Sequence, residues 1–251
     1  PANAAKVLWG AYFESAEPDL RTRYALWELY RRYPCIFAEA AGPVLDVAFS
    51  HDDRWLVAVI LGKKLLIWDT ASWEVVESEA DFAGGCLAFA PNESVIYAGG
   101  DDGILRRRRI QTQGKIVDLQ SFPDVRISDA PIRCLTVSDA ADRLVFGCGI
   151  ASKDDVTKRW TKRGCAVHTY QVLPDATLQR ERTFPCDTPV MSIDLNEYAD
   201  VIAVGTQWTE ANPQGKVVLL EATTLTPIAW HDSGPTVYGL QSSTADSTLL
   251  I

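Results

Sequence analysis

The residues of this chain that could do chemistry are few and far apart. The three histidines fall in a turn (His51), on a strand (His168) and just past a strand (His231), and none has the spacing to a second histidine or a carboxylate that a metal site needs. Asp52-Asp53 and Asp101-Asp102 are typical of turns. The sequence contains no Gly-rich phosphate loop and no nucleophile elbow. We therefore predict no catalytic residue, no metal and no cofactor.

A run of four arginines, Arg106–Arg109, is the most concentrated charge in the chain. On a strand the side chains alternate, so Arg106 and Arg108 face one way while Arg107 and Arg109 face the other. Arg107 is expected to point into a buried interface, where an unpaired guanidinium is very costly. Two interpretations stay open: the arginines pair with acidic residues of neighbouring strands, or they bind a phosphate or an acidic peptide.

A second basic segment, residues 150–164, surrounds Trp160 with Arg159, Lys162 and Arg163. It interrupts two predicted strands with far more residues than a tight turn needs, although the entropy cost of lengthening a loop rises only slowly. An exposed Trp among cations is typical of a binding anchor. The alternative is a solvated loop in which Trp160 folds back onto the domain.

Four short strands separated by tight turns are predicted over residues 44–78. The first alternates, with Leu45, Val47 and Phe49 on the face expected to be buried. Residues 55–61 are almost entirely apolar and predict a strand buried on both faces. Trp68 and Asp69 close the third strand, and residues 73–78 form the outer edge.

The same layout recurs along the chain. Positions equivalent to Phe49 fall at Phe89, Val137, Leu195 and Ser242, in steps of 40, 48, 58 and 47 residues. With Trp68-Asp69 at the end of a third strand, the chain resembles the WD40 repeat family, whose period is roughly 40–45 residues. The resemblance implies an all-β, WD40-type β-propeller with four complete blades and partial blades at both ends.

We expect residues 1–251 to form a single propeller domain or a propeller fragment. Its predicted parts are a partial blade at 6–41, complete blades at 44–78, 86–120, 131–184 and 189–232, and a partial blade at 236–251. Trp27 and Glu28 would hold the places of Trp68 and Asp69 in the first partial blade. A helix over residues 19–33 competes with that assignment, because Leu20, Tyr24 and Trp27 recur at helical spacing. Closure of the ring within this chain and a split or longer propeller both remain open.

In WD40 propellers, the loops between second and third strands open on the same face as the loops between blades. That face would gather Trp160, Trp208 and Phe122 into an aromatic rim with mixed charge. The Gly-His pair that often precedes the first strand of a repeat is missing. The hydrogen-bonded tetrad of the family is therefore not expected, and packing and turns must replace it.

Composition fits an interaction domain. Hydrophobic residues make up 47% of the chain, and the net charge of −9 disfavours a general nucleic-acid binder. No apolar stretch is long enough to span a membrane. The six cysteines lack metal spacing and are expected to be reduced thiols of an intracellular protein, cytoplasmic or nuclear. The expected function is a non-catalytic scaffold for protein or peptide partners within a multiprotein complex. A phosphate or RNA reader and a propeller enzyme are the alternatives.

Overall fold

The structure is a computed structural model with two compact units, Pro1–Ala41 and Gly42–Ile251. It describes residues 21–25, 28, 42–62, 64–91, 93–113, 116–154, 159–173, 175–196, 198–207, 215–234, 236–242 and 249–250.

The described residues of the first unit are helical, namely 21–25 and Glu28. The prediction that Glu28 ends a strand is therefore wrong, and at these positions the competing helix is the observed structure. At these positions the backbone follows the helical alternative and not the repeat register. Trp27 and the rest of the partial blade predicted at 6–41 lie outside the described residues.

Among its described residues, the second unit has four antiparallel sheets whose first four strands follow sequence order, and a two-stranded sheet after them. The first holds β1 (Val44–Phe49), β2 (Trp55–Ile60), β3 (Lys64–Asp69) and β4 (Glu74–Ala80). The second holds β5 (Cys86–Phe89), β6 (Val95–Gly99), β7 (Ile104–Gln113) and β8 (Ile116–Ser121), with β9 (Val125–Arg126) also paired to β7. The third holds β10 (Ile132–Val137), β11 (Arg143–Lys153), β12 (Trp160–Val172) and β13 (Leu178–Pro185). The fourth holds β14 (Val190–Leu195), β15 (Val201–Thr206), β16 (Gly215–Glu221) and β17 (Pro227–Gly234), and it is followed by the pair β18 (Gln241–Ser242) and β19 (Leu249–Leu250).

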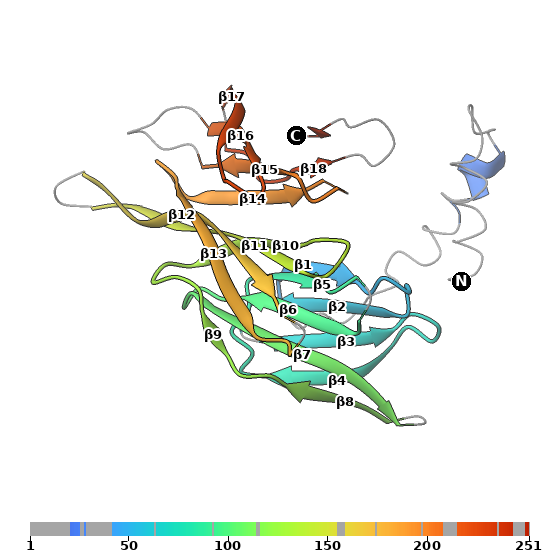
Figure 1. Ribbon diagram of the computed structural model, residues 1–251. Helices are drawn as coiled ribbons and strands as arrows, with labels where there is room; N and C mark the ends of the chain where they lie inside the picture. The colour runs from blue at the N-terminus through green and yellow to red at the C-terminus, as the bar shows by residue number, and fades with distance from the viewer. Residues whose placement is uncertain are drawn as a thin grey trace. The chain divides into compact units, whose positions relative to one another are not determined.

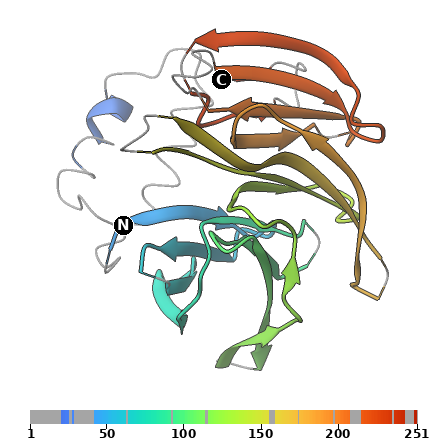
Figure 2. The same cartoon turned by 90° about the vertical axis from the view of Figure 1, so that its left-hand side faces the viewer.

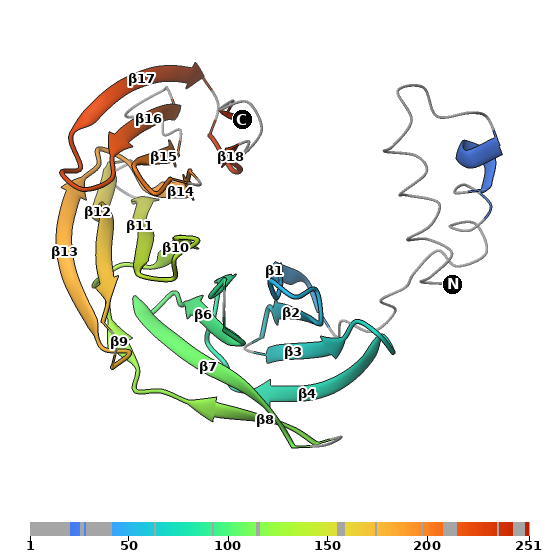
Figure 3. The same ribbon diagram turned by 45° about the vertical axis from the view of Figure 1, so that its right-hand side comes forward.

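These sheets are the blades of a β-propeller, as the sequence predicted (Figure 1). Within the second unit the first strands of the blades lie near a common centre, and β4, β8, β13 and β17 lie on the outside (Figure 3). Figure 2 shows the blades from a second direction, stacked face to face. The arrangement brings the turns between first and second strands, and between third and fourth strands, to one face of the unit. The loops between second and third strands, and between blades, lie on the other.

The core lies between the blades, because each four-stranded sheet has apolar residues on both faces. Val57, Val59 and Ile67 of the first blade pack with Leu87 and Ile96 of the second. Two further clusters join the second blade to the third and the third to the fourth. This burial is the main stabilisation of the unit, since apolar area removed from water contributes about 25 cal/mol per Å².

The prediction for β1 was wrong about which face is buried. Leu45, Val47 and Phe49 are exposed, at 45%, 52% and 52% of their surface. The opposite face, with Asp46 and Ala48, turns toward the second blade and is half-buried. The alternation itself is present, but neighbouring blades and not the strand pattern determine which face is covered.

The blades are joined near their first strands by a contact that repeats in all four. The residues concerned each lie three positions before a predicted repeat marker, and each reaches the backbone of the next blade. They are Asp46, Cys86, Cys134 and Ser192. Asp46 accepts from the backbone nitrogen of Leu87 at 2.7 Å, and the Ser192 hydroxyl donates to the carbonyl of Val237 at 3.1 Å. The Cys86 and Cys134 thiols lie 3.8 and 4.0 Å from the carbonyl oxygens of Ile132 and Val190.

Glycine faces this contact in three of the blades. Gly99, Gly147 and Gly205 pair across the ladder with Cys86, Cys134 and Ser192. A Cβ atom on Gly147 would lie 2.4 Å from the Cys134 sulfur and 2.5 Å from a methyl group of Val190. The absence of a side chain lets the next blade approach this closely. These contacts fix the spacing between the blades.

Candidate interaction site

The arginine run on β7 is mostly paired with acidic residues, as one of the two interpretations predicted. Arg106 pairs with Asp102 at 2.6 Å and Arg109 with Glu93 at 2.8 Å. Arg108 binds Glu79 of the neighbouring blade with both arms of its guanidinium, at 2.8 and 2.7 Å. Arg107 is the exception, because the described residues contain no ion pair for it.

The third blade carries a long hairpin, which is the most distinctive feature of its face. β11 has 11 residues and β12 has 13, whereas β2 and β3 have six each. The extension is a ladder in which Ile150–Lys153 pair with Trp160–Arg163. In Figure 1 it projects beyond the adjacent sheets. Much of the predicted loop is therefore ordered strand, so its side chains are held in register.

Strand alternation divides the predicted anchor residues between two faces of the hairpin. Trp160 and Lys162 are on one face, and Thr161 and Arg163 are on the other. Trp160 is half-buried, and its indole nitrogen is covered and has no acceptor among the described residues. Arg159 is exposed and precedes the strand. These four residues cannot all meet a single flat partner surface from one side.

Arg163 lies at a hollow of about 610 Å³ between the hairpin and the loop that joins the second and third blades. The loop contributes Arg126, Ile127, Ser128 and Asp129. The remaining lining residues belong to the third blade, namely Arg163, Gly164, Cys165, Ala166, His168 and Arg180. Gly164 has a positive φ of 60°, and a Cβ there would lie 2.5 Å from that of Ala130, so the hairpin and loop are in close contact. As predicted from the family's topology, these two segments share a face.

The hollow is electropositive. Three arginines and one aspartate line it, and burial and the nearby Arg180 lower the pKa of His168 to about 4, so this imidazole is neutral at pH 7. His168 Nδ1 is 2.9 Å from the Thr183 hydroxyl. Arg180 donates to the Tyr170 hydroxyl at 2.8 Å and to the carbonyl of Ile127. Arg180 thus tethers the interblade loop, while the exposed Arg163 remains available at the rim.

The other predicted rim residues are not brought to this hollow. Phe122 lies instead beside the guanidinium groups of Arg107 and Arg109, with 5.1 and 5.2 Å between each guanidinium carbon and the ring centroid. The chain turns inward after β8, and this places Phe122 in a separate hollow toward the opposite face. Trp208 is outside the described residues. Trp68 is buried and Asp69 accepts from the backbone nitrogen of Ala71 at 2.8 Å, so both are structural.

Sequence reasoning missed Arg126, His168 and Arg180 as parts of one surface. They come from an interblade loop, a third strand and a fourth strand, so nothing in their spacing relates them. The sequence does carry a signal for the interblade contact residues. Cys86 and Cys134 each lie three positions before a repeat marker, Phe89 and Val137 respectively.

The described residues contain neither a reactive cysteine site nor a metal-binding cluster. The five described cysteines are free thiols. Burial raises the pKa of Cys148 and of Cys186 to about 12, so these thiols stay protonated. No group of three or more metal-binding side chains occurs among the described residues. Likewise, none of the described helical segments has the length and apolar character needed to cross a membrane.

Comparison with known proteins agrees with this architecture. The family model for the WD domain, G-beta repeat, matches residues 85–106, which span β5, β6 and the start of β7. A chain in the "Crystal Structure of Mitotic Checkpoint Complex" is similar in fold, with a TM-score of 0.61 and 15% identity. The match covers 81% of this chain and 57% of that chain. No curated protein sequence gives a match. The described part of Gly42–Ile251 is thus a β-propeller with four complete blades, and its second blade carries the match to the WD40 repeat model.

Proposed function

We propose that this propeller is a non-catalytic scaffold that binds protein partners through the face carrying the β11–β12 hairpin and the 121–130 loop. The observation that carries the proposal is the ordered hairpin itself. It holds Trp160, Lys162 and Arg163 on a rigid ladder and lies beside an electropositive hollow. Because the ladder is ordered before binding, this protein loses less conformational entropy on docking there than a flexible loop would lose.

Trp160 supports a protein partner over a purely ionic one. Tryptophan and arginine are the residues most enriched at the energetic centres of protein interfaces. The half-buried Trp160 ring offers a partner apolar surface next to Lys162 on the same face of the ladder. Arg163 at the rim of the hollow suits an acidic group on the partner. The structure with similar fold is titled as a complex, which agrees with a role in a multiprotein assembly inside the cell.

The test compares capture by the wild type with capture by Trp160→Ala and Arg163→Glu variants. Each captured protein is identified and purified, and its affinity is then measured for the wild type and for both variants. Trp160→Ala should weaken binding of a true partner at least tenfold, with the unfolding midpoint shifted by under about 2 °C. Tyr198→Ala is the matched control, because Tyr198 is a surface aromatic, 74% exposed, and belongs to neither the hairpin nor the hollow.

Two outcomes would overturn the proposal. One is equal affinity of the wild type, Trp160→Ala and Arg163→Glu for every purified partner. The other is a large loss of stability in Trp160→Ala, which would show that the ring belongs to the core. Affinity that falls steeply with salt and needs RNA would instead support the nucleic-acid reader.

A further inference from the structure

Arg107 stands apart from the other three arginines of β7. It is 6% exposed, and its Nε atom is buried without an acceptor. A guanidinium offers five N–H donors, but the described residues give Arg107 one acceptor, the carbonyl oxygen of Ala176 in the next blade. Burial lowers the pKa of Arg107, although not enough to remove its charge. Arg107 is therefore a buried positive charge that contacts no carboxylate among the residues the structure describes.

This charge borders a cavity of about 300 Å³ between the second and third blades, which we call the Arg107 hollow. It lies toward the face of the turns between first and second strands, away from the hairpin. Apolar and polar side chains line it in about equal measure, and the polar ones are Glu93, Tyr97, Arg107, Arg109 and Asp142. Phe122 packs against both guanidinium groups from one side.

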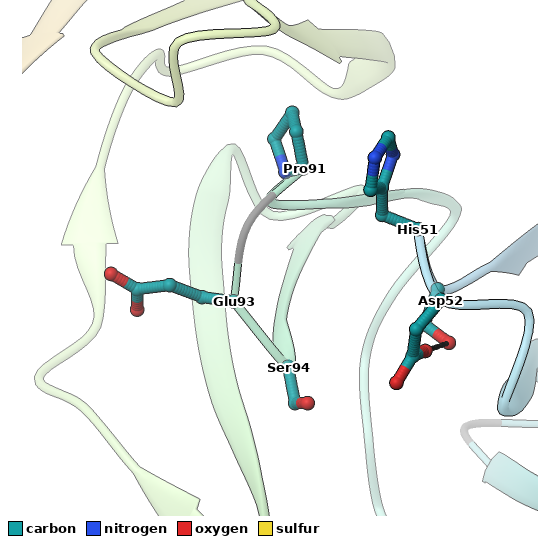
Figure 4. Close-up of a pocket in the computed structure, with 6 residues that line it drawn as sticks. His51, Asp52, Pro91, Glu93 and Ser94 are labelled. Atoms are coloured by element: carbon teal, nitrogen blue, oxygen red, sulfur yellow. Dashed lines mark hydrogen bonds between the residues drawn. The ribbon is translucent and has the colours of Figure 1, made fainter.

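The two acidic residues in the lining bind partners other than Arg107. Glu93 pairs with Arg109 at 2.8 Å, and Asp142 accepts from the Ser138 hydroxyl at 2.7 Å. Figure 4 shows Glu93 pointing away from His51 and Asp52, the residues of a smaller neighbouring hollow. Two arginines and two carboxylates line the Arg107 hollow, but Glu93 pairs with Arg109 and Asp142 binds Ser138. No anion among the described residues is in contact with Arg107 itself.

We propose that the Arg107 hollow binds a single carboxylate, presented by an acidic peptide segment of a protein partner. A carboxylate accepts two parallel bonds from a guanidinium, and this would satisfy the donors that Arg107 leaves unused. The apolar side chains in the lining, such as Val95 and Phe122, suit a glutamate or aspartate flanked by small apolar residues. A phosphate fits less well, because its second charge would lie near Glu93 and Asp142 without a second free cation among the described lining residues.

The experiment follows the Arg107 Nε–Hε resonance of ¹⁵N-labelled protein, assigned by its absence in Arg107→Met. The probe is the peptide acetyl-Ala-Glu-Ala-amide, and the matched probe is acetyl-Ala-Gln-Ala-amide. The Glu peptide should shift the resonance saturably, and the Gln peptide should bind at least about tenfold more weakly, because an ionised partner strengthens such a hydrogen bond by about 1.5 kcal/mol or more. Inorganic phosphate should bind more weakly than the Glu peptide.

Arg107→Met should lose the Glu-peptide shifts of neighbouring backbone amides while remaining folded. Its stability should equal or exceed that of the wild type, since an apolar side chain of similar length replaces an unbalanced buried charge. Arg163→Met, on the other face, should bind the Glu peptide as the wild type does. The proposal is overturned if no saturable shift occurs, if Glu and Gln peptides bind alike, or if phosphate binds more tightly than both.

This inference does not depend on the hairpin site. Trp160→Ala should leave the Glu-peptide affinity unchanged, and Arg107→Met should leave capture through the hairpin unchanged. Failure of one site is therefore distinguishable from failure of the other.

Discussion

The carboxylate of Asp46 in the first blade accepts a 2.7 Å hydrogen bond from the backbone nitrogen of Leu87 in the second. The same carboxylate accepts from the backbone nitrogen of Val47 at 2.9 Å. Burial raises the pKa of Asp46, and the two backbone hydrogen bonds oppose that rise. Joining the first two blades therefore removes the Asp46 carboxylate from water, and this desolvation opposes the free energy gained from the contact.

We predict that the Leu87 amide resonance titrates together with the Asp46 carboxyl, with a pKa above the ordinary aspartate value of 3.8. Because the folded state holds this proton to a higher pH than the unfolded chain, the Asp46 contribution to stability is full below the unfolded pKa and falls as the pH rises through the folded pKa. NMR titration from pH 3 to 7 measures both groups. In Asp46→Ala the Leu87 amide should no longer titrate; a Leu87 amide that still does so would contradict the assignment.

Gly147→Ala should destabilise the protein by about 1–3 kcal/mol, the usual cost of overpacking. The new methyl group would overlap the Cys134 sulfur and Val190 at the contact between the third and fourth blades. Urea unfolding measures the change. Gly239→Ala is the control, because a Cβ added there would meet no atom within 4 Å and its φ is not positive, so it should shift stability by under about 0.5 kcal/mol.

Arg108→Gln should cost more stability than Arg109→Gln. Arg108 is buried, binds Glu79 with two hydrogen bonds and stacks on Phe82 with 5.4 Å from guanidinium carbon to ring centroid. Removing it leaves a partly buried carboxylate unpaired, at a cost of about 2–4 kcal/mol. The Arg109–Glu93 pair is more exposed, and its loss should cost under about 1 kcal/mol. Equal costs in chemical unfolding would show that the Arg108–Glu79 pair contributes no more to stability than the exposed Arg109–Glu93 pair.

His168 should make stability fall below neutral pH. Its folded pKa of about 4 is lower than the ordinary 6.5, so the unfolded chain takes up the proton first as the pH drops. The stabilising contribution is full above pH 6.5 and is lost progressively toward pH 4, by about 2 kcal/mol, since its hydrogen bond to Thr183 and the open hollow moderate the desolvation. Unfolding of wild type and His168→Gln across this range isolates the contribution of this side chain. The variant should lack this part of the pH dependence, and parallel curves would refute it.

Much of the fold could be predicted because strands and turns depend on patterns of apolar and turn residues that are close together in the sequence. The repeat markers from Phe49 to Leu195 and the apolar runs of the second strands predicted the number and order of the complete blades. The helix at 21–25 shows where such patterns become ambiguous. Strand register and helical spacing both accounted for Tyr24 and Trp27, and the repeat alone could not decide between them.

The site was predicted only in part. The sequence marked the basic segment around Trp160, but the division of Trp160 and Arg163 between two faces depends on the register of β12 against β11. Phe122 was assigned to the wrong neighbours, because its position depends on how the chain turns after β8 and on the arginines beneath it.

The sequence by itself determined that alternating and wholly apolar segments at repeated intervals would form four-stranded blades, since strand period and turn chemistry are local properties. Only the tertiary structure decided which face of β1 stays exposed and which three arginines find carboxylates, and among the described residues Arg107 contacts none. These outcomes depend on contacts between residues tens of positions apart. The physical reason is that burial and charge pairing belong to the space between blades, and the approach of two blades fixes that space.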